Sequence, residues 1–240
     1  MNNYLVVIPT YNERESIEKV ITALSKLGES NSLSILIVDD GSPDATADFV
    51  DSLGFNFVTV LRRSEKSGLG ASYRAGFSWG LAQSQFTHFV SMDGDGSHRA
   101  IDLQEMISEV PGSDLVLGSR WIAGGAIINW PKYRQLISRV GTAYATRALK
   151  LTISDITGGF KIYSRRILEK IQIDSISSEG YCFQIEMVMA AADHGAIITE
   201  VPITFVEREA GRSKMSQAIV VEALWKTTLW GLRRRMGNRR

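Results

Sequence analysis

Short apolar runs alternate with helix-length amphipathic segments through the first half of the chain, and this alternation most constrains its fold. Residues 71–82, for example, form a predicted helix between two runs rich in β-branched and aromatic residues. The predicted strands are Tyr4–Ile8, Leu33–Val38, Phe57–Leu61, His88–Met92 and Leu115–Leu117. Strands alternating with helices in this way predict an α/β fold, with a mostly parallel central sheet and helices on both faces. Ligands of such sheets bind beyond the carboxyl ends of the strands.

The second half is less regular and ends in a basic helix. Its predicted elements are a glycine-rich loop over Ala123–Ala126, a helix over residues 133–149, a strand over residues 160–163, a helix near residues 183–192 and a strand over residues 197–206. Near the N-terminus, Asn12 is predicted to cap the first helix, with Glu15 three residues later. No Pro- or Ser-rich linker interrupts the chain, so we expect one main domain over residues 1–214 and a C-terminal helix over residues 215–240.

Composition excludes several classes of protein. Of the 240 residues, 44% are hydrophobic and 22% are charged, which is typical of a globular protein and not of disordered or collagen-like chains. The single cysteine, Cys182, cannot form an internal disulfide, as expected in a reducing compartment. No apolar run approaches the roughly 18 residues of a membrane-spanning helix, and the N-terminus lacks a signal-peptide pattern. We therefore expect a cytoplasmic location.

Charge is concentrated at the C-terminus. The last ten residues contain five arginines and no acid, whereas the rest of the chain carries 22 basic and 26 acidic residues. An apolar stripe precedes and overlaps these arginines at helical spacing, with Trp230 beside it, and consists of Val221, Trp225, Leu229, Leu232 and Met236. Such a helix can lie in a membrane interface, or it can pack on the domain with a solvated basic end. Nucleic acid is a poor partner because the basic residues gather at one terminus without a recognised binding fold.

An acidic motif, Asp93-Gly94-Asp95, follows one predicted strand directly. Two carboxylates at a strand end suit Mg²⁺ or Mn²⁺ held partly by a diphosphate, where the ion would act as a Lewis acid. The alternative is a polar loop whose carboxylates cap the helix that starts near Ala100. His98 follows the motif, and its simplest role is a local hydrogen bond.

Polar clusters also follow the first two strands. Residues 9–13 offer an aromatic ring and a carboxylate, and Asp39-Asp40 adds acceptors for a base or a ribose. Each cluster alone is typical of turns. Together with the acidic motif they would share one edge of a parallel sheet, which predicts a ligand site there. Gly68-Leu69-Gly70 resembles part of a dinucleotide fingerprint, but Tyr73 occupies the position of the third glycine, so a helix start explains it better.

An ordered series of segments then resembles a known family. VIPTYNERE, IVDDGSPDAT, GLGASYRAGF, MDGDGSH and GSRWIAGG are similar to inverting family 2 glycosyltransferases with the Rossmann-like A-type fold. NWPKYRQLIS, DITGGFKIY, GYCFQIEM and EVPITFVEREAGRSKM resemble, more narrowly, the dolichol-phosphate mannose synthases and their bacterial polyprenol monophosphomannose synthases. The resemblance covers residues 4–230. It implies transfer of mannose from GDP-mannose to a polyprenyl phosphate.

The resemblance also implies roles for individual residues. Matches to the nucleotide-sugar site are Pro9, Tyr11, Glu13, Val38, Asp40, Asp93, Gly94, Asp95, Ser97, Arg208 and Lys214, with the metal on Asp93 and Asp95. Matches to the acceptor-phosphate site are Arg120, Arg134 and Ser138. Asp93, Asp95 and Arg120 are expected to carry catalysis. Ser97 stands where some members have Gln, and Cys182 where some have Lys, which puts the donor contact at Cys182 in doubt.

Charge considerations favour the same arrangement. A lipid phosphate and a nucleotide diphosphate repel each other, so one site for both needs cations. Arg120 and Arg134 suit this role because a guanidinium group can bond two phosphate oxygens at once, although either arginine alone would more simply serve surface solubility. The expected reaction is a single in-line displacement with inversion. A phosphate monoester has a second pKa of about 6, so the nucleophile is already anionic and no catalytic base is expected.

Two alternatives to the mannosyltransferase remain at this point. One is a transferase of the same fold with another nucleotide sugar, such as UDP-glucose, or another acceptor. The other is a noncatalytic nucleotide-sugar-binding or membrane-adaptor module. A lipid acceptor leads us to expect a peripheral position at the inner face of the cell membrane, with a separate transmembrane protein as a further expected anchor.

Overall fold

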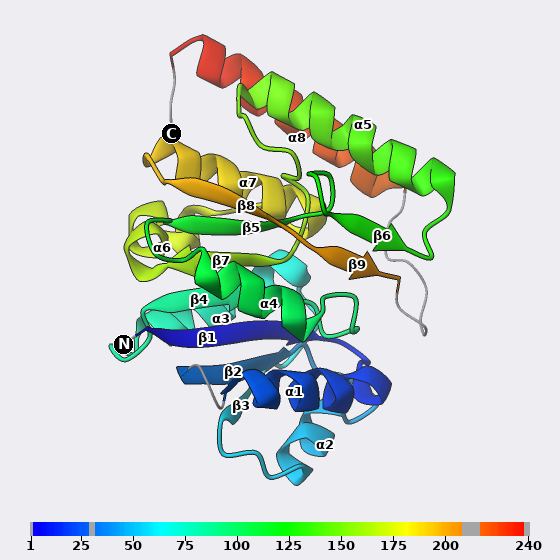
Figure 1. Cartoon of the computed structure of the whole chain (residues 1–240), viewed down its shortest axis with the longest axis vertical. Coiled ribbons are helices and arrows are strands. Elements are labelled where there is room, and N and C mark those ends of the chain that lie inside the picture. Colours follow the sequence, from blue (N-terminus) through cyan, green and yellow to red (C-terminus); the bar gives the residue numbers. More distant parts are fainter. Residues whose placement is uncertain (1, 29–31, 208–216, 238–240) are drawn as a thin grey trace.

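A seven-stranded sheet forms the centre of the molecule in the computed structural model, which describes residues 2–28, 32–207 and 217–237 (Figure 1). Its strand order is β3-β2-β1-β4-β7-β5-β8. The strands are β1 (Asn3–Thr10), β2 (Ser32–Asp39), β3 (Val58–Arg62), β4 (His88–Ser91), β5 (Leu115–Ser119), β7 (Lys161–Ser164) and β8 (Ile198–Pro202). β7 runs antiparallel to β4 and β5, and the other neighbouring pairs are parallel. The predicted α/β fold with a mostly parallel sheet is confirmed.

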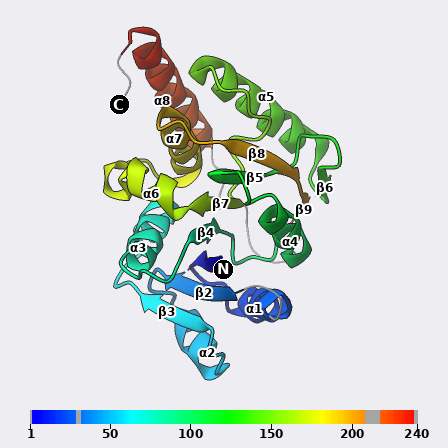
Figure 2. The same cartoon turned by 60° about the vertical axis from the view of Figure 1, so that its left-hand side comes forward.

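Helices cover both faces of the sheet. They are α1 (Arg14–Gly28), α2 (Thr46–Ser52), α3 (Leu69–Leu81), α4 (Ala100–Ser108), α5 (Lys132–Leu149), α6 (Arg165–Ile171), α7 (Gly180–Asp193) and α8 (Gln217–Arg235). Side chains of β1 alternate between two cores: Leu5 and Val7 pack with α3 and α7, whereas Val6 and Ile8 pack with α1 and α4. Figure 2 shows α3 and α1 on opposite sides of the strands. The parallel direction of β1, β2, β4 and β5 brings their carboxyl ends to the same edge of the sheet.

The strand predicted over residues 197–206 is interrupted. β8 pairs with β5 in the main sheet, but β9 (Thr204–Val206) pairs in parallel with β6 (Ala126–Ile128) in a separate two-stranded sheet. Pro202 ends β8, and a proline has no N–H with which to continue a ladder. β6 begins at the end of the expected glycine-rich loop. After this break the chain leaves the main sheet and continues in the two-stranded sheet.

Asn12 does not cap the first helix, so that prediction is wrong. Its backbone adopts a left-handed conformation with φ of 60°, which Asn tolerates, and its N–H donates to the Ser42 hydroxyl at 3.1 Å. The carbonyl of Glu13 instead accepts from the N–H groups of Ser16 and Ile17. The helix thus begins at Arg14, one residue later than a cap at Asn12 would place it.

α8 packs on the domain through one face and leaves its apolar stripe exposed. Trp230, expected beside the stripe, is only 6% exposed and lies in the core with α5 and α7. A Cβ atom at Gly231 would lie 2.7 Å from the carbonyl oxygen of Ala148 on α5, so only glycine permits this approach. In the stripe itself, the side chains of Val221, Trp225, Leu232 and Met236 are exposed and that of Leu229 is half-buried. The expected packing of this helix on the domain is therefore confirmed, whereas its position in a membrane interface stays a prediction.

Two further expectations concern the domain boundary and membrane-spanning helices. The expected boundary between residues 214 and 215 lies outside the described ranges. Within those ranges, none of the helices combines the length and the apolarity needed to cross a membrane.

Candidate active site

A cavity of about 450 Å³ opens beyond the carboxyl ends of β1, β2, β4 and β5, where the sheet predicts a ligand site. We call it the strand-end cavity. The predicted site residues that line it are Pro9, Tyr11, Glu13, Asp40, Asp93, Gly94, Asp95, Arg120 and Arg134. Val38, Ser97 and Ser138 are not among its lining residues, and Arg208 and Lys214 lie outside the described residues.

Val38 and Ser97 are buried beside residues that line the cavity. Val38 is wholly buried in the core and pairs with Pro9 across β1 and β2. Ser97 is also buried, and its N–H donates to Asp95 Oδ1 at 3.0 Å. The nucleotide contacts that the resemblance implies for these two residues stay predictions.

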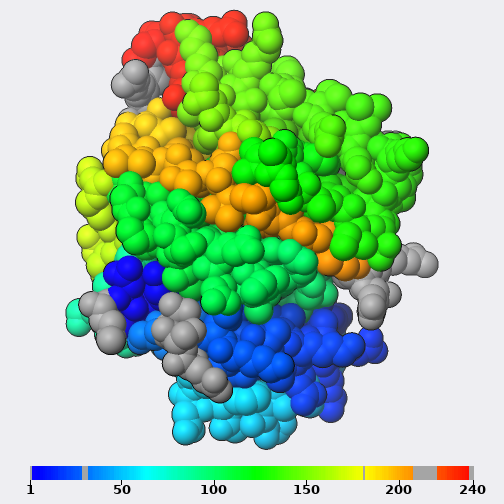
Figure 3. Space-filling model, viewed as in Figure 1, coloured from blue at the N-terminus to red at the C-terminus, as the bar shows by residue number. Residues whose placement is uncertain are grey.

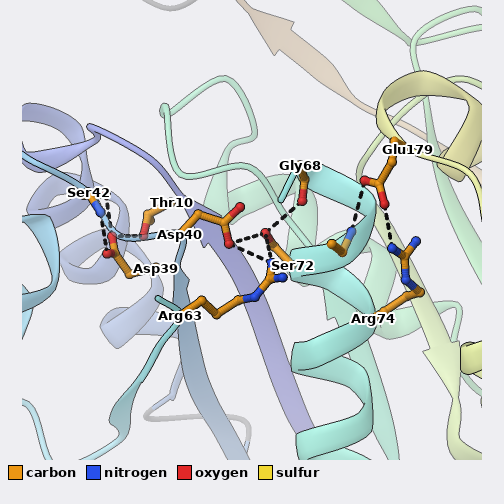
Figure 4. Close-up of polar contacts among 10 residues, drawn as sticks. Thr10, Asp39, Asp40, Ser42, Arg63, Gly68, Ser72, Arg74 and Glu179 are labelled. Carbon is orange, nitrogen blue, oxygen red and sulfur yellow. Dashed lines mark hydrogen bonds and ion pairs between the residues drawn. The ribbon is translucent and has the colours of Figure 1, made fainter. Parts of the chain in front are cut away.

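Asp39 and Asp40, which follow one another, have different environments (Figure 4). Asp39 accepts hydrogen bonds from the hydroxyls of Thr10 and Ser42 and from the Ser42 N–H, so it organises the turn after β2. Asp40 Oδ1 accepts from Arg63 Nη1 and from the Ser72 hydroxyl, each at 2.8 Å, and Asp40 also lines the cavity. Of the two carboxylates predicted to accept hydrogen bonds from a ligand, Asp40 therefore remains the candidate. Asp39 stabilises the turn after β2.

The start of α3 forms another wall. Gly68 has φ of 97°, and the Ala71 N–H donates to Glu179 Oε2 at 3.1 Å, with Arg74 pairing to the same carboxylate (Figure 4). A Cβ atom at Gly70 would lie 2.5 Å from the Ser178 carbonyl oxygen. The glycines are therefore required by a helix start packed against the α7 entry, as predicted, and not by a dinucleotide fingerprint.

The acidic motif lies at the end of β4. The hydroxyl of Tyr73 donates to Asp93 Oδ1 at 3.4 Å, and the Asp93 side chain is 33% exposed. α4 starts after Arg99 with no side-chain cap, so neither carboxylate caps this helix and that alternative is wrong. The motif instead turns its backbone so that both Asp93 and Asp95 reach the cavity.

His98 fixes this turn through the local hydrogen bond predicted for it. The Asp93 N–H donates to His98 Nδ1 at 3.1 Å, which leaves Nδ1 without a proton. The imidazole stacks on Phe160 at 4.7 Å between ring centroids and is 4% exposed. Burial lowers the pKa of His98, although the charges of Asp93 and Asp95 oppose this effect. At neutral pH the ring is therefore uncharged.

The acidic motif fits part of a divalent-cation site. Asp93 and Asp95 offer the hard oxygen ligands that Mg²⁺ and Mn²⁺ prefer. No group of three or more His, Cys, Asp or Glu side chains suited to a metal occurs in the described ranges. A cation there would need further oxygen ligands from a bound diphosphate or water, which agrees with the way Mg²⁺ is commonly held.

Arg120 follows β5, lines the cavity and is fixed by a buried ion pair. Its Nε and Nη2 atoms donate to the two oxygens of Asp155 at 2.6 and 2.8 Å, and Nη2 also donates to Thr157 Oγ1 at 3.2 Å. The side chain is 7% exposed and Asp155 is fully buried. Burial alone would raise the pKa of Asp155, but the charge and hydrogen bonds of Arg120 lower it below its ordinary value. Arg120 is not a surface solubility residue.

Arg134 provides the second cation from α5. It pairs with Glu207, and its guanidinium lies over the Trp130 ring at 4.1 Å from the centroid. Its Nε atom is buried and has no hydrogen-bond partner within the described part of the chain. Ser138 follows one turn later on α5 and is half-buried.

Several lining residues were missed by sequence reasoning, namely Lys66, Ser72, Trp130, Thr157, Gln184, Phe205 and Glu207. The ammonium group of Lys66 lies 3.9 Å from the centroid of the Tyr11 ring. Thr157, Gln184, Phe205 and Glu207 all fall inside segments that carry the family resemblance, which is the only signal that could have found them. Cys182 is 1% exposed in the core and is not a lining residue, so its side chain makes no donor contact in the cavity.

Comparison with known proteins identifies the family. The model of glycosyl transferase family 2 matches residues 5–172. The chain belongs to glycosyl transferase family 2. It is accordingly an enzyme of the glycosyltransferase class, which leaves the noncatalytic module without support.

Two curated relatives match nearly the whole chain. Polyprenol monophosphomannose synthase of Mycolicibacterium smegmatis is 43% identical over 240 residues, covering 98% of this chain and 89% of that protein. Undecaprenyl-phosphate mannosyltransferase of Micrococcus luteus is 46% identical over 231 residues, covering 95% of this chain and 93% of that protein. These relatives confirm the predicted family resemblance.

Solved structures support the fold. The crystal structure of glucosyl-3-phosphoglycerate synthase from Mycobacterium tuberculosis with Mn²⁺, UDP and glucosyl-3-phosphoglycerate has a TM-score of 0.68 and 20% identity, covering 100% of this chain and 81% of that chain. Another structure of that enzyme, with Mn²⁺, UDP-glucose and phosphoglyceric acid, has a TM-score of 0.67. At this identity the likeness shows the A-type fold alone.

Proposed function

We propose that the chain transfers mannose from GDP-mannose to a polyprenyl phosphate, with inversion at the anomeric carbon. The observation that carries this proposal is that the carboxylates of Asp93 and Asp95 and the guanidinium groups of Arg120 and Arg134 line one cavity. The names of the two curated relatives support a polyprenyl phosphate acceptor and mannose as the transferred sugar.

The nucleotide would occupy the Tyr11 side of the cavity. Tyr11 offers a ring for base stacking, and Asp40 offers acceptor oxygens in a position fixed by Arg63 and Ser72. Asp93 and Asp95 would hold the diphosphate through Mg²⁺ or Mn²⁺. Bound there, the cation would neutralise the charge that develops on the leaving GDP.

The acceptor phosphate would bind between Arg120 and Arg134. Their partners, Asp155 and Glu207, hold both guanidinium groups in place before the substrate arrives, so little reorganisation is needed. The phosphate is already anionic at neutral pH, so no residue needs to remove a proton from it. Catalysis then depends on positioning and on charge stabilisation.

An exposed apolar face beside the cavity supports a position at the membrane surface. On α5, Tyr133, Leu136, Ile137 and Val140 share one helix face and are 48–68% exposed. α8 lies alongside α5, and the two helices together form the upper end of the molecule in Figure 3. Arg134 is on α5 as well, but its side chain lines the cavity. A lipid phosphate could thus reach Arg134 while its polyprenyl chain remains at the apolar face.

The test is direct assay of transfer. Purified protein is incubated with labelled GDP-mannose, Mg²⁺ and a short polyprenyl phosphate, and an acid-labile mannolipid is expected. UDP-glucose, offered in parallel, should give much less product. Label transferred equally well from UDP-glucose, or undiminished transfer by Asp95→Ala in the presence of a chelator, would contradict the proposal.

A further inference from the structure

Gln184 is a buried amide that faces the strand-end cavity with one half unsatisfied. It lies on α7, most of whose side chains are buried, and is itself 3% exposed. Its Oε1 atom accepts a hydrogen bond from Lys161 Nζ. No residue that the structure describes accepts one from its Nε2 atom. Burying an amide donor without a partner is costly, so a ligand that completes it is to be expected.

Lys161 determines which way the amide points. Its Nζ atom donates both to Gln184 Oε1 and to the carbonyl oxygen of Gly158. Two donated bonds need only two hydrogens, which the amino group carries whether or not it is protonated. The reverse orientation would turn the amide N–H groups toward this donor. Oε1 therefore faces Lys161, and Nε2 faces the cavity that Gln184 lines.

The position of Gln184 within the cavity is set by Gly159. A Cβ atom at Gly159 would lie 3.5 Å from Asp93 Oδ1 and 3.6 Å from Gln184 Nε2, so the carboxylate and the amide border the same space. Two residues earlier on the same loop, Thr157 accepts from Arg120. Gln184 is thus near both the acidic motif and the loop that holds Arg120.

An in-line displacement places the transferred sugar between the leaving diphosphate and the incoming phosphate. If the diphosphate is held at Asp93 and the acceptor at Arg120, as the proposed function requires, the space above Gly159 is where the sugar must lie. We propose that Gln184 Nε2 donates a hydrogen bond to a hydroxyl of the transferred sugar. Gln184 is then a specificity-determining residue, and Lys161 is the positioning residue that orients it.

Binding measurements with GDP and GDP-mannose test this inference, which rests on the proposed function. In Gln184→Met, affinity for GDP-mannose should fall about tenfold while affinity for GDP stays unchanged, because only the sugar contact is lost. Gln104→Met on α4 is the matched control, since Gln104 is exposed and does not line the cavity. Equal changes for both ligands, or no change for either, would overturn the inference.

Monodeoxy analogues of GDP-mannose test the same contact from the side of the ligand. One analogue should bind the wild-type chain about tenfold more weakly than GDP-mannose, and Gln184→Met should cause no further loss with that analogue. If every analogue binds the wild-type chain as tightly as GDP-mannose does, Gln184 makes no such bond. Failure of the proposed function looks different, because the wild-type chain would then neither bind GDP-mannose nor form mannolipid, and the inference would fail with it.

Discussion

At the scale of single residues, buried ion pairs hold the cationic side of the cavity in place. Arg120 and Asp155 are both buried, so removing either charge takes a close counter-charge away from the other in a poorly solvated place. The exposed pair between Arg62 and Asp48 has the same chemistry but lies in water, with side chains 48% and 77% exposed. These two pairs allow burial to be tested separately from charge.

Asp155→Asn should lower the free energy of unfolding by about 3 kcal/mol, because it removes the buried carboxylate that pairs with the buried guanidinium group of Arg120. Asp48→Asn should change it by less than about 1 kcal/mol. Urea denaturation at pH 7 measures both. Since the pKa of Asp155 is held below its ordinary 3.8, its contribution is present above that pH and is lost as the pH falls further. Equal effects of the two substitutions would contradict this account.

Lys161 should make stability rise with pH in the same sense as Asp155, but over a higher pH range. Burial lowers its pKa from 10.5 to about 7, despite the nearby Asp155, so between these values the unfolded chain binds a proton that the folded chain does not. The wild-type chain should therefore gain stability relative to Lys161→Met as the pH rises from 7 to 9, by up to about 1.4 kcal/mol per pH unit. A difference that stays constant over this range would show that the lysine is not buried as described.

At the scale of elements, the packing of α8 on α5 depends on a glycine. The close approach of Gly231 to Ala148 leaves no room for a side chain, whereas a Cβ atom at Gly141 on α5 meets no described atom within 4 Å. The two positions lie in the interiors of neighbouring helices. They therefore share the same intrinsic helix propensity and differ in packing.

Gly231→Ala should destabilise the chain, because the methyl group forces α8 away from α5. Gly141→Ala should stabilise it by up to about 1 kcal/mol, because alanine favours a helix and nothing obstructs it. Thermal unfolding of the two variants gives the signs of both effects. A stabilising Gly231→Ala would mean that the two helices do not pack in this way.

Local patterns in the sequence predict the helices and strands well, but they predict the contacts between distant residues less well. The first-half strands and the helix over residues 133–149 follow from apolar periodicity, which is a local property. The ion pair of Arg120 joins residues 35 positions apart, and Lys161 reaches Gln184 across 23 positions, so no local pattern reveals either contact. For the same reason the stripe of α8 was predicted, but the burial of Trp230 against the core was not.

At the scale of the whole molecule, the proposed function requires the strand-end cavity and the exposed apolar face of α5 to act together. The sheet brings four strand ends to one edge, and α5 extends from that edge to an apolar surface. Such a surface on a chain proposed to use a lipid substrate is expected to meet the bilayer.

Polar substitution on this face should weaken membrane binding. Leu136→Ser with Val140→Ser should reduce flotation with anionic vesicles by about tenfold, because both exposed side chains would lose apolar burial. Ile101→Ser is the control, since Ile101 is 53% exposed on α4, outside this face. If the control variant loses as much binding as the double variant, the face is not the docking surface.

The most direct test of the shared cavity is the separate measurement of the two Michaelis constants. Arg134→Gln should raise KM for polyprenyl phosphate about tenfold and leave KM for GDP-mannose within about twofold, since in the proposed arrangement this guanidinium group binds the acceptor phosphate and not the donor. Asp95→Asn should instead lower kcat and raise KM for GDP-mannose, with KM for polyprenyl phosphate unchanged. If Arg134→Gln raises KM for GDP-mannose and leaves KM for polyprenyl phosphate unchanged, the donor diphosphate does not bind on the Asp95 side of the cavity with the acceptor phosphate on the Arg134 side.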